Sequence, residues 1–257
     1  MDPSIYSQLL EHLRSCLANS TALLALEQKI KEATATQQNL FLTLSAIFLT
    51  HLQEPQLQWV ASLLLKNTLK DNLHALKEDP ARTQELEAIK QALFLVAVNT
   101  PTDKHILGSK KLQEEYYMVV SGLIVKEFNL NDADTGLINE VIRGYQRGYN
   151  YHLLRIINDV IEDGNDDRMW KFVPQILPAT LVYLNTVQEN KLLFNVWLLM
   201  QTAQWTIGVD QSALDSCFNQ EVMTCILGFI MTSSYIKLLP PTPNLSPLQA
   251  GQSVESL

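Results

Sequence analysis

Glycine is scarce in this chain, with only 9 Gly among 257 residues. Glycine is the usual residue wherever the backbone needs a positive φ, so a chain with few glycines has few tight turns. Apolar residues make up 47% of the sequence and charged residues 18%, which is typical of an ordinary globular protein. The composition therefore predicts an all-α protein with short turns and long helices.

Cysteine is also rare, and Cys16, Cys217 and Cys225 are odd in number and widely separated. They form neither a disulfide framework nor a metal-ligand spacing. The histidines also lack the i, i+4 pairs and the neighbouring cysteines that zinc sites use. We therefore expect no metal site, no cofactor and a reducing compartment. The residues from Met1 to Ser20 read as an amphipathic helix rather than a signal peptide, so we expect the cytoplasm and the nucleus.

Signatures of catalysis are missing from the sequence. It contains no Gly-rich phosphate loop and no Gly-x-Ser-x-Gly elbow. Two acidic turns, at 162–167 and 132–136, do not place oxygen ligands at the positions that an EF-hand requires, so they read as solvated turns. We expect no catalytic residues and no enzyme activity.

The formal net charge is −8, so positive charge is in short supply. Binding to nucleic acid depends on neutralising phosphates with Lys and Arg, which argues against that ligand. An acidic surface is better suited to protein partners that carry basic groups.

Apolar residues recur at spacings of three and four along nearly the whole chain, which predicts a succession of amphipathic helices. Acidic residues that precede a proline, at Asp2-Pro3, Glu54-Pro55 and Asp79-Pro80, mark helix starts. The predicted helices cover approximately residues 3–17, 21–33, 38–52, 55–73, 80–98, a part of 104–127, 133–142, 151–161, 167–187, 190–207 and 211–239.

These helices group into pairs whose first members start at intervals of about 40 residues, the period of HEAT and armadillo units. A single hairpin cannot bury both of its apolar stripes, and stacking against the next hairpin covers them. We predict an all-α, HEAT/ARM-like α-α superhelical solenoid of about five helical hairpins over residues 1–239. The Pro- and Ser-rich residues 240–257 are predicted to be a disordered tail. A compact helical bundle is the alternative that the pattern leaves open.

The stretch from Pro55 to Asn72, PQLQWVASLLLKNTLKDN, carries an apolar run that ends in Leu65-Lys66-Asn67. With Ala25-Leu26-Glu27 and the segment from Gln113 to Phe128, it resembles the N-terminal HEAT-repeat portion of the importin-β (karyopherin-β) family of nuclear transport receptors, over about residues 1–128. The sequence departs from the family at Gln58, where an Arg is usual, and it has no Trp between Thr68 and His74. Complete receptors of the family are several times longer than this chain.

The resemblance implies a protein-binding scaffold that forms the N-terminal arch of a nuclear transport receptor. It implies binding of the small GTPase Ran in its GTP form through Lys66 and Asn67, nucleoporins bound in grooves between outer helices, and a protein cargo. A generic helical adaptor without a role in transport is one alternative. A tail-anchored membrane protein is another, because Val222 to Leu239 is nearly long enough and apolar enough to span a bilayer, although its hydroxyl groups and Lys237 weaken such a span.

Aromatic residues give two further expectations. The four tryptophans fall where large rings would fill gaps between stacked hairpins. The pair Tyr116-Tyr117 and the run from Gly144 to Tyr149 could anchor a partner if exposed, whereas a plain helix end and turn is the alternative. The tryptophans are Trp59, Trp170, Trp197 and Trp205.

Overall fold

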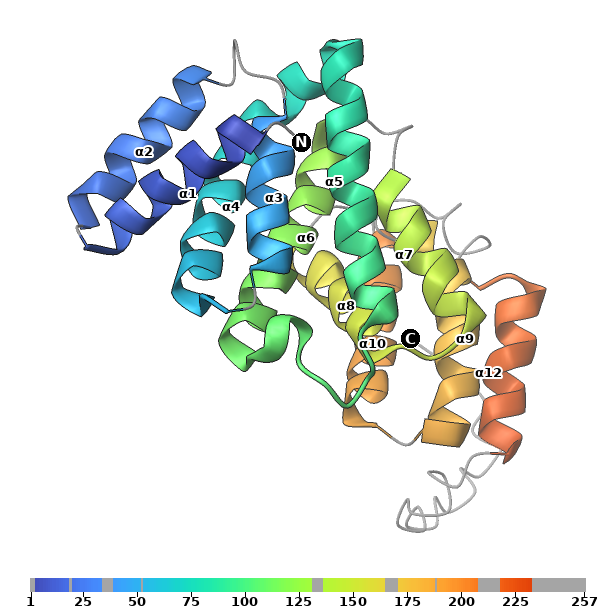
Figure 1. Ribbon diagram of the computed structural model, residues 1–257. Coiled ribbons are helices and arrows are strands. Elements are labelled where there is room, and N and C mark those ends of the chain that lie inside the picture. The colour runs from blue at the N-terminus through green and yellow to red at the C-terminus, as the bar shows by residue number, and fades with distance from the viewer. Residues whose placement is uncertain are drawn as a thin grey trace, which may run out of the picture.

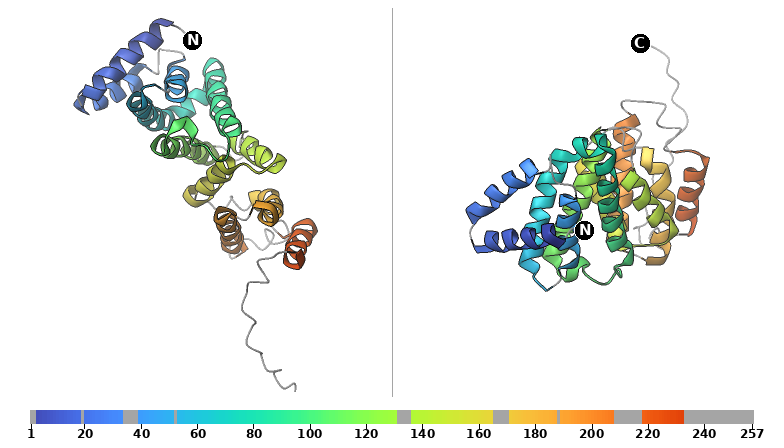
Figure 2. Two further views of the ribbon diagram at one scale, coloured as in Figure 1. Left: turned by 60° about the horizontal axis from the view of Figure 1, so that its bottom comes forward. Right: turned by 45° about the horizontal axis from the view of Figure 1, so that its top comes forward.

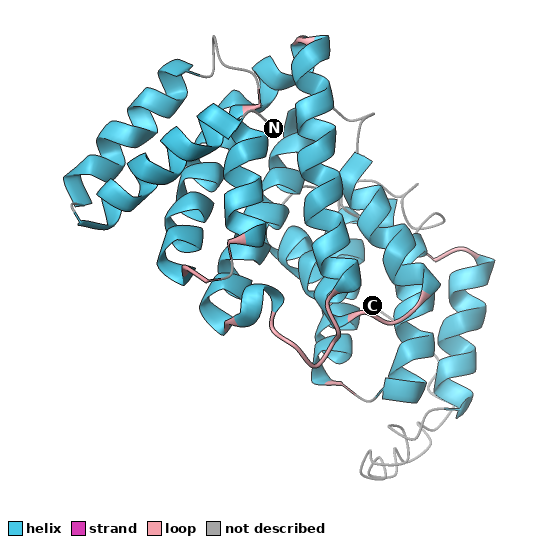
Figure 3. Ribbon diagram, in the orientation of Figure 1, coloured by secondary structure: helices cyan, strands magenta, loops and turns pink. Residues whose placement is uncertain are grey.

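The computed structural model describes residues 3–18, 20–33, 39–51, 53–130, 136–164, 171–187, 189–207 and 218–232. Within these ranges the regular structure is helical throughout and contains no strand (Figure 3). The predicted all-α class is therefore confirmed for the described part of the chain. The helices are α1 (Pro3–Ala18), α2 (Ser20–Ala33), α3 (Leu40–Thr50), α4 (Pro55–Glu78), α5 (Pro80–Asn99), the short 3-10 helix η1 (Ile106–Gly108), α6 (Lys110–Leu130), α7 (Gly136–Arg147), α8 (Tyr151–Gly164), α9 (Val173–Val187), α10 (Asn190–Ile207) and α12 (Gln220–Thr232).

Helix boundaries follow the local signals in the sequence. Pro55 and Pro80 occupy the first turns of α4 and α5, where a missing backbone N–H costs nothing. The Asp79 carboxylate accepts a hydrogen bond from the backbone N–H of Ala81 at 2.9 Å and so caps α5. α4 is longer than predicted and continues to Glu78, because no helix breaker precedes Asp79 and the buried Leu76 extends its apolar stripe.

The helices lie in two rows that run side by side (Figures 1 and 2). One row consists of α3, α5, α7, α9 and α12, each in contact with the next. The other consists of α4, α6, α8 and α10, again in contact in chain order. The α1–α2 hairpin packs at one end, where α1 contacts α3 and α4 and α2 contacts α4. We call the second set of helices the α4–α10 row.

A continuous apolar core fills the space between the rows. It is built mainly from Leu, Ile and Val, and its largest fully buried side chains include Tyr116, Tyr117, Tyr145, Phe41 and Phe48. Burial of this kind of apolar surface is the main favourable contribution to folding, at about 25 cal/mol per Å². Each helix therefore depends on its neighbours in both rows.

The structure corrects the idea that Tyr116 and Tyr117 anchor a partner, because both rings are buried in the core. The Tyr116 hydroxyl donates to the Leu93 carbonyl, and the Tyr117 hydroxyl lies 2.8 Å from Nδ1 of His152. Tyr145, in the run from Gly144 to Tyr149, is also fully buried, so its ring is not an exposed anchor for a partner. These rings bridge helices because their hydroxyl groups find partners inside the protein.

The tryptophans divide into two groups. Trp59 is partly buried against the core, as the expectation of gap filling requires. Trp197 does not fill a gap, because 54% of it is exposed and its ring stacks on Phe194 at the surface of α10. Trp170 and the side chain of Trp205 lie outside the described residues.

A buried polar network connects the second half of the two rows. Asn195 on α10 donates to the side-chain oxygen of Asn158 on α8 at 2.5 Å and accepts from the Thr180 hydroxyl on α9 at 2.8 Å. The Tyr145 hydroxyl on α7 lies 3.1 Å from the Thr180 oxygen. Since buried polar groups are costly without partners, these contacts fix the register of four helices.

The predicted apolar segment from Val222 to Leu239 corresponds in part to α12, which ends at Thr232. None of the described helices is both long and apolar enough to cross a membrane. Residues 233–239 of that segment, and the predicted tail at 240–257, lie outside the described residues.

Candidate protein-binding face on the α4–α10 row

Lys66 and Asn67 lie in the middle of α4, directly after the buried Leu65. The helical period turns Leu65 and Leu69 toward the core, so the two polar residues reach the surface of the α4–α10 row. The Lys66 side chain is 23% exposed, and Asn67 is exposed. Both residues implied by the family resemblance are thus accessible, although their side chains contact different neighbouring helices.

Lys66 is linked to α6. Its Nζ lies 3.6 Å from Oε2 of Glu115, a buried carboxylate. The indole N–H of Trp59 donates to Oε1 of Glu115 at 3.3 Å, and the ammonium of Lys111 lies 4.2 Å above the Trp59 ring. This cluster orients the Lys66 side chain by holding its carboxylate partner in place.

Asn67 is linked to α2. Its side-chain amide donates to Oε2 of Glu27 at 3.3 Å, and Lys31 bridges Glu27 at 3.2 Å and Asp71 at 3.0 Å. These contacts join α2 to α4 at the surface around Asn67.

Sequence reasoning missed a third feature of this face, at Lys70 of α4 and Gly122 and Lys126 of α6. An added Cβ on Gly122 would lie 2.4 Å from both Cε and Nζ of Lys70, so the Lys70 side chain crosses α6 where this helix has no side chain. Burial, followed by repulsion from Lys66 and Lys126, lowers the pKa of the Lys70 ammonium. The spacing Lys66, Lys70 was visible in the sequence, but only the packing of α6 places Lys126 beside it.

A network of buried ion pairs lies beneath this face. Lys90 of α5 pairs with Glu127 of α6, and their side chains are 4% and 2% exposed. Lys77 of α4 lies 3.3 Å from the same Glu127 oxygen, and Lys90 also donates to Glu87 at 2.6 Å. Burial would lower the pKa of Lys90, but hydrogen bonds to Glu127 and Glu87 outweigh that effect and raise it. Lys90 thus stays charged, and Glu127, paired with both Lys90 and Lys77, connects α4, α5 and α6.

A groove lies between α5 and α7 in the opposite row, with a volume of about 340 Å³. Phe94, Leu95 and Leu137 supply apolar lining, whereas Glu87 and Glu140 supply carboxylates. The groove thus combines an apolar lining with two carboxylates.

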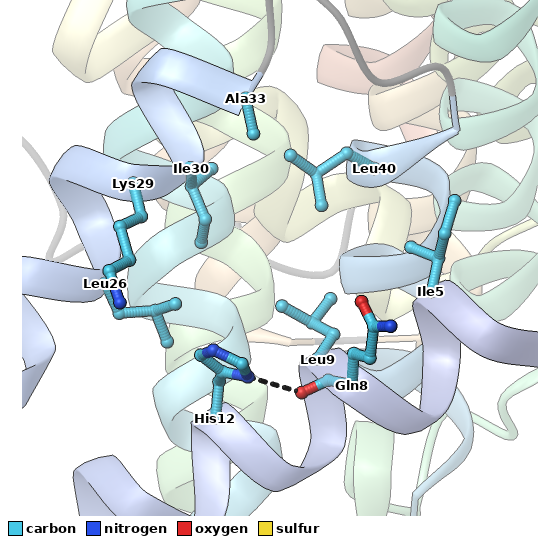
Figure 4. Close-up of a pocket in the computed structure, with 9 residues that line it drawn as sticks. All are labelled: Ile5, Gln8, Leu9, His12, Leu26, Lys29, Ile30, Ala33 and Leu40. Atoms are coloured by element: carbon cyan, nitrogen blue, oxygen red, sulfur yellow. Dashed lines mark hydrogen bonds between the residues drawn. The ribbon is translucent and has the colours of Figure 1, made fainter.

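A smaller cavity of about 140 Å³ opens between α1 and α2 (Figure 4). Its lining is mainly apolar, including Leu9, Leu26 and Ile30, with His12 and Lys29 among its polar residues. The His12 Nδ1 donates to the Gln8 carbonyl at 2.7 Å. A cavity of this volume has room for a single side chain of a partner.

Among the described residues, no cluster of three or more His, Cys, Asp or Glu side chains could hold a metal ion. In comparisons with known proteins, no family model, no curated protein and no solved structure matches this chain.

Proposed function

We propose that this chain is a HEAT-like helical scaffold that binds proteins in nucleocytoplasmic transport, and that it binds Ran in its GTP form through the face around Lys66 and Asn67. The observation that carries the proposal is the segment Pro55–Asn72, which resembles the family and lies on the single helix α4. Its Leu65 is buried while Lys66 and Asn67 reach the surface, which is the arrangement that a binding motif needs.

The packing of the helices supports a solenoid in which each hairpin covers its neighbour. Two parallel rows with contacts between successive members are typical of repeat arrays and differ from helices gathered around one closed centre. Such arrays offer extended surfaces for other proteins. Protein cargo and nucleoporins are the further partners we propose, the latter in the groove between α5 and α7. We place this activity in the cytoplasm and the nucleus, and we propose no enzymatic role.

The test is a pull-down with Ran locked in the GTP or the GDP state. We expect retention of the GTP state and a loss of about tenfold in affinity for a Lys66→Met, Asn67→Ala variant, because both substitutions remove polar groups from the face. Glu27→Gln is the matched control, since it weakens the contact with Asn67 but keeps Lys66 and Asn67 in place. Equal binding of both nucleotide states, or binding of neither, would remove the assignment to transport and leave a general helical adaptor.

A further inference from the structure

Three lysines, Lys66, Lys70 and Lys126, lie around Gly122 and form a positively charged patch. The proposed binding of Ran does not account for this patch. Lys66 and Lys70 lie one turn apart on α4, and Lys126 follows Gly122 by one turn on α6. The Lys70 ammonium lies against Gly122, one turn before Lys126, so Lys70 links the lysines of α4 and α6. In a protein with a net charge of −8, a grouping of like positive charges is unexpected.

These lysines are poorly compensated within the chain. Lys66 has Glu115 at 3.6 Å, a long ion pair. Among the described residues, neither Lys70 nor Lys126 has a carboxylate within ion-pair distance, and Asp163 near the end of α8 acts on Lys70 only from farther away. Mutual repulsion without compensation destabilises the folded chain, so the grouping serves little structural purpose.

Gly122 gives the cluster a defined shape. Because α6 has no side chain there, the Lys70 ammonium rests against the helix and is held near Lys126 instead of extending freely into solvent. Met118, one turn before Gly122 on the same side of α6, is 42% exposed and adds an apolar contact next to the charges. The surface thus combines three cations with one apolar side chain.

We propose that Lys66, Lys70 and Lys126, arranged around Gly122, form a docking surface for a short acidic segment of a protein partner. Two or three carboxylates match the number of ammonium groups, and an adjacent apolar side chain of the partner fits Met118. A nucleic acid fits less well, because its binding depends on neutralising a long row of phosphates, whereas this cluster has only three ammonium groups and is bounded by the carboxylates of Asp71 and Asp163. The inference rests on the proposed role of this row as a protein-binding face, but it does not require that the partner is Ran.

The experiment measures fluorescence anisotropy of a labelled peptide of five Glu and Asp residues around one Leu, titrated with the full chain at low and at high salt. We expect Lys70→Met, Lys126→Met to weaken binding about tenfold, equivalent to about 1.4 kcal/mol. The matched control is Lys104→Met, Lys171→Met, which removes the same charge from exposed positions elsewhere. Binding by this control should change less than twofold.

Gly122→Ala is the sharper variant, because it changes no charge. The new methyl group displaces the Lys70 ammonium, so we expect binding to the acidic peptide to weaken about threefold while helix content by circular dichroism is unchanged. No binding by the parent chain, or equal losses in the cluster variant and its control, would overturn the proposal. Tighter, Lys70-dependent binding of a labelled oligouridylate would overturn the choice of partner.

The two proposals fail separately. A chain that binds the acidic peptide through Lys70 but shows no preference for either form of Ran keeps this docking surface and loses the transport assignment. A chain that binds Ran in its GTP form but ignores the peptide loses the docking surface alone.

Discussion

The buried pair of Lys90 and Glu127 allows a quantitative test of how the rows are joined. Replacing Lys90 with Met removes one charge and leaves the Glu127 carboxylate in a site where its side chain is only 2% exposed. Removing one partner of a buried ion pair typically costs about 3–5 kcal/mol, which is a large share of a domain's free energy of unfolding. Lys77 remains 3.3 Å from Glu127, so we expect a loss near the lower limit, about 3 kcal/mol.

The measurement is thermal unfolding followed by circular dichroism. For a chain of this size, about 3 kcal/mol corresponds to a fall in Tm of roughly 6–12 °C. Lys104→Met, at an exposed position, serves as the control and should shift Tm by less than about 2 °C.

The double variant Lys90→Met, Glu127→Leu separates the cost of an orphaned charge from the value of the pair. Because two apolar side chains of similar size need no counter-charge, we expect the double variant to recover most of the loss. A Lys90→Met variant as stable as the parent would refute the reasoning, since it would mean that solvent reaches Glu127. A double variant less stable than either single variant would mean that packing, rather than charge, dominates the site.

Two other predictions concern the second half of the chain. Asn195→Leu leaves the buried Asn158 and Thr180 without their shared partner, so urea unfolding should show a loss of about 2–4 kcal/mol, and a change below about 0.5 kcal/mol would contradict the proposed network. For Asp159, burial outweighs the hydrogen bond from Arg155 and raises the pKa of the carboxyl to about 6 from an ordinary value of 3.8. A raised carboxyl pKa gives stability that is complete below the ordinary value and is lost as pH rises through the folded value. The free energy of unfolding of the parent should therefore fall relative to that of Asp159→Asn between pH 4 and about 6.5, by up to about 3 kcal/mol, which is read as a falling Tm. A Tm difference that stays constant over this pH range would show that Asp159 has its ordinary pKa, and a change in the opposite direction would show that its pKa is lowered.

The helices themselves could be read from the sequence because their signals are local. Pro80 after Asp79 begins α5 as expected, since capping and the fixed φ of proline act within one turn. The predicted end of α4, near Leu73, was wrong. The helix continues past it because no helix breaker occurs before Asp79. Lys66 and Asn67 were singled out by the resemblance alone, and the structure leaves Lys66 partly exposed and Asn67 exposed.

What the sequence alone determined is therefore the all-α class and most of the helices, since each follows from contacts within a few residues. Only the tertiary structure decided which side chains meet. Tyr116 and Tyr117 look like candidate anchors until α5 and α8 cover them, and Lys126 joins Lys70 only because α6 packs against α4 at Gly122. The physical reason is that burial and electrostatics depend on distances in space, and no periodicity along the chain specifies the distance between residues on different helices.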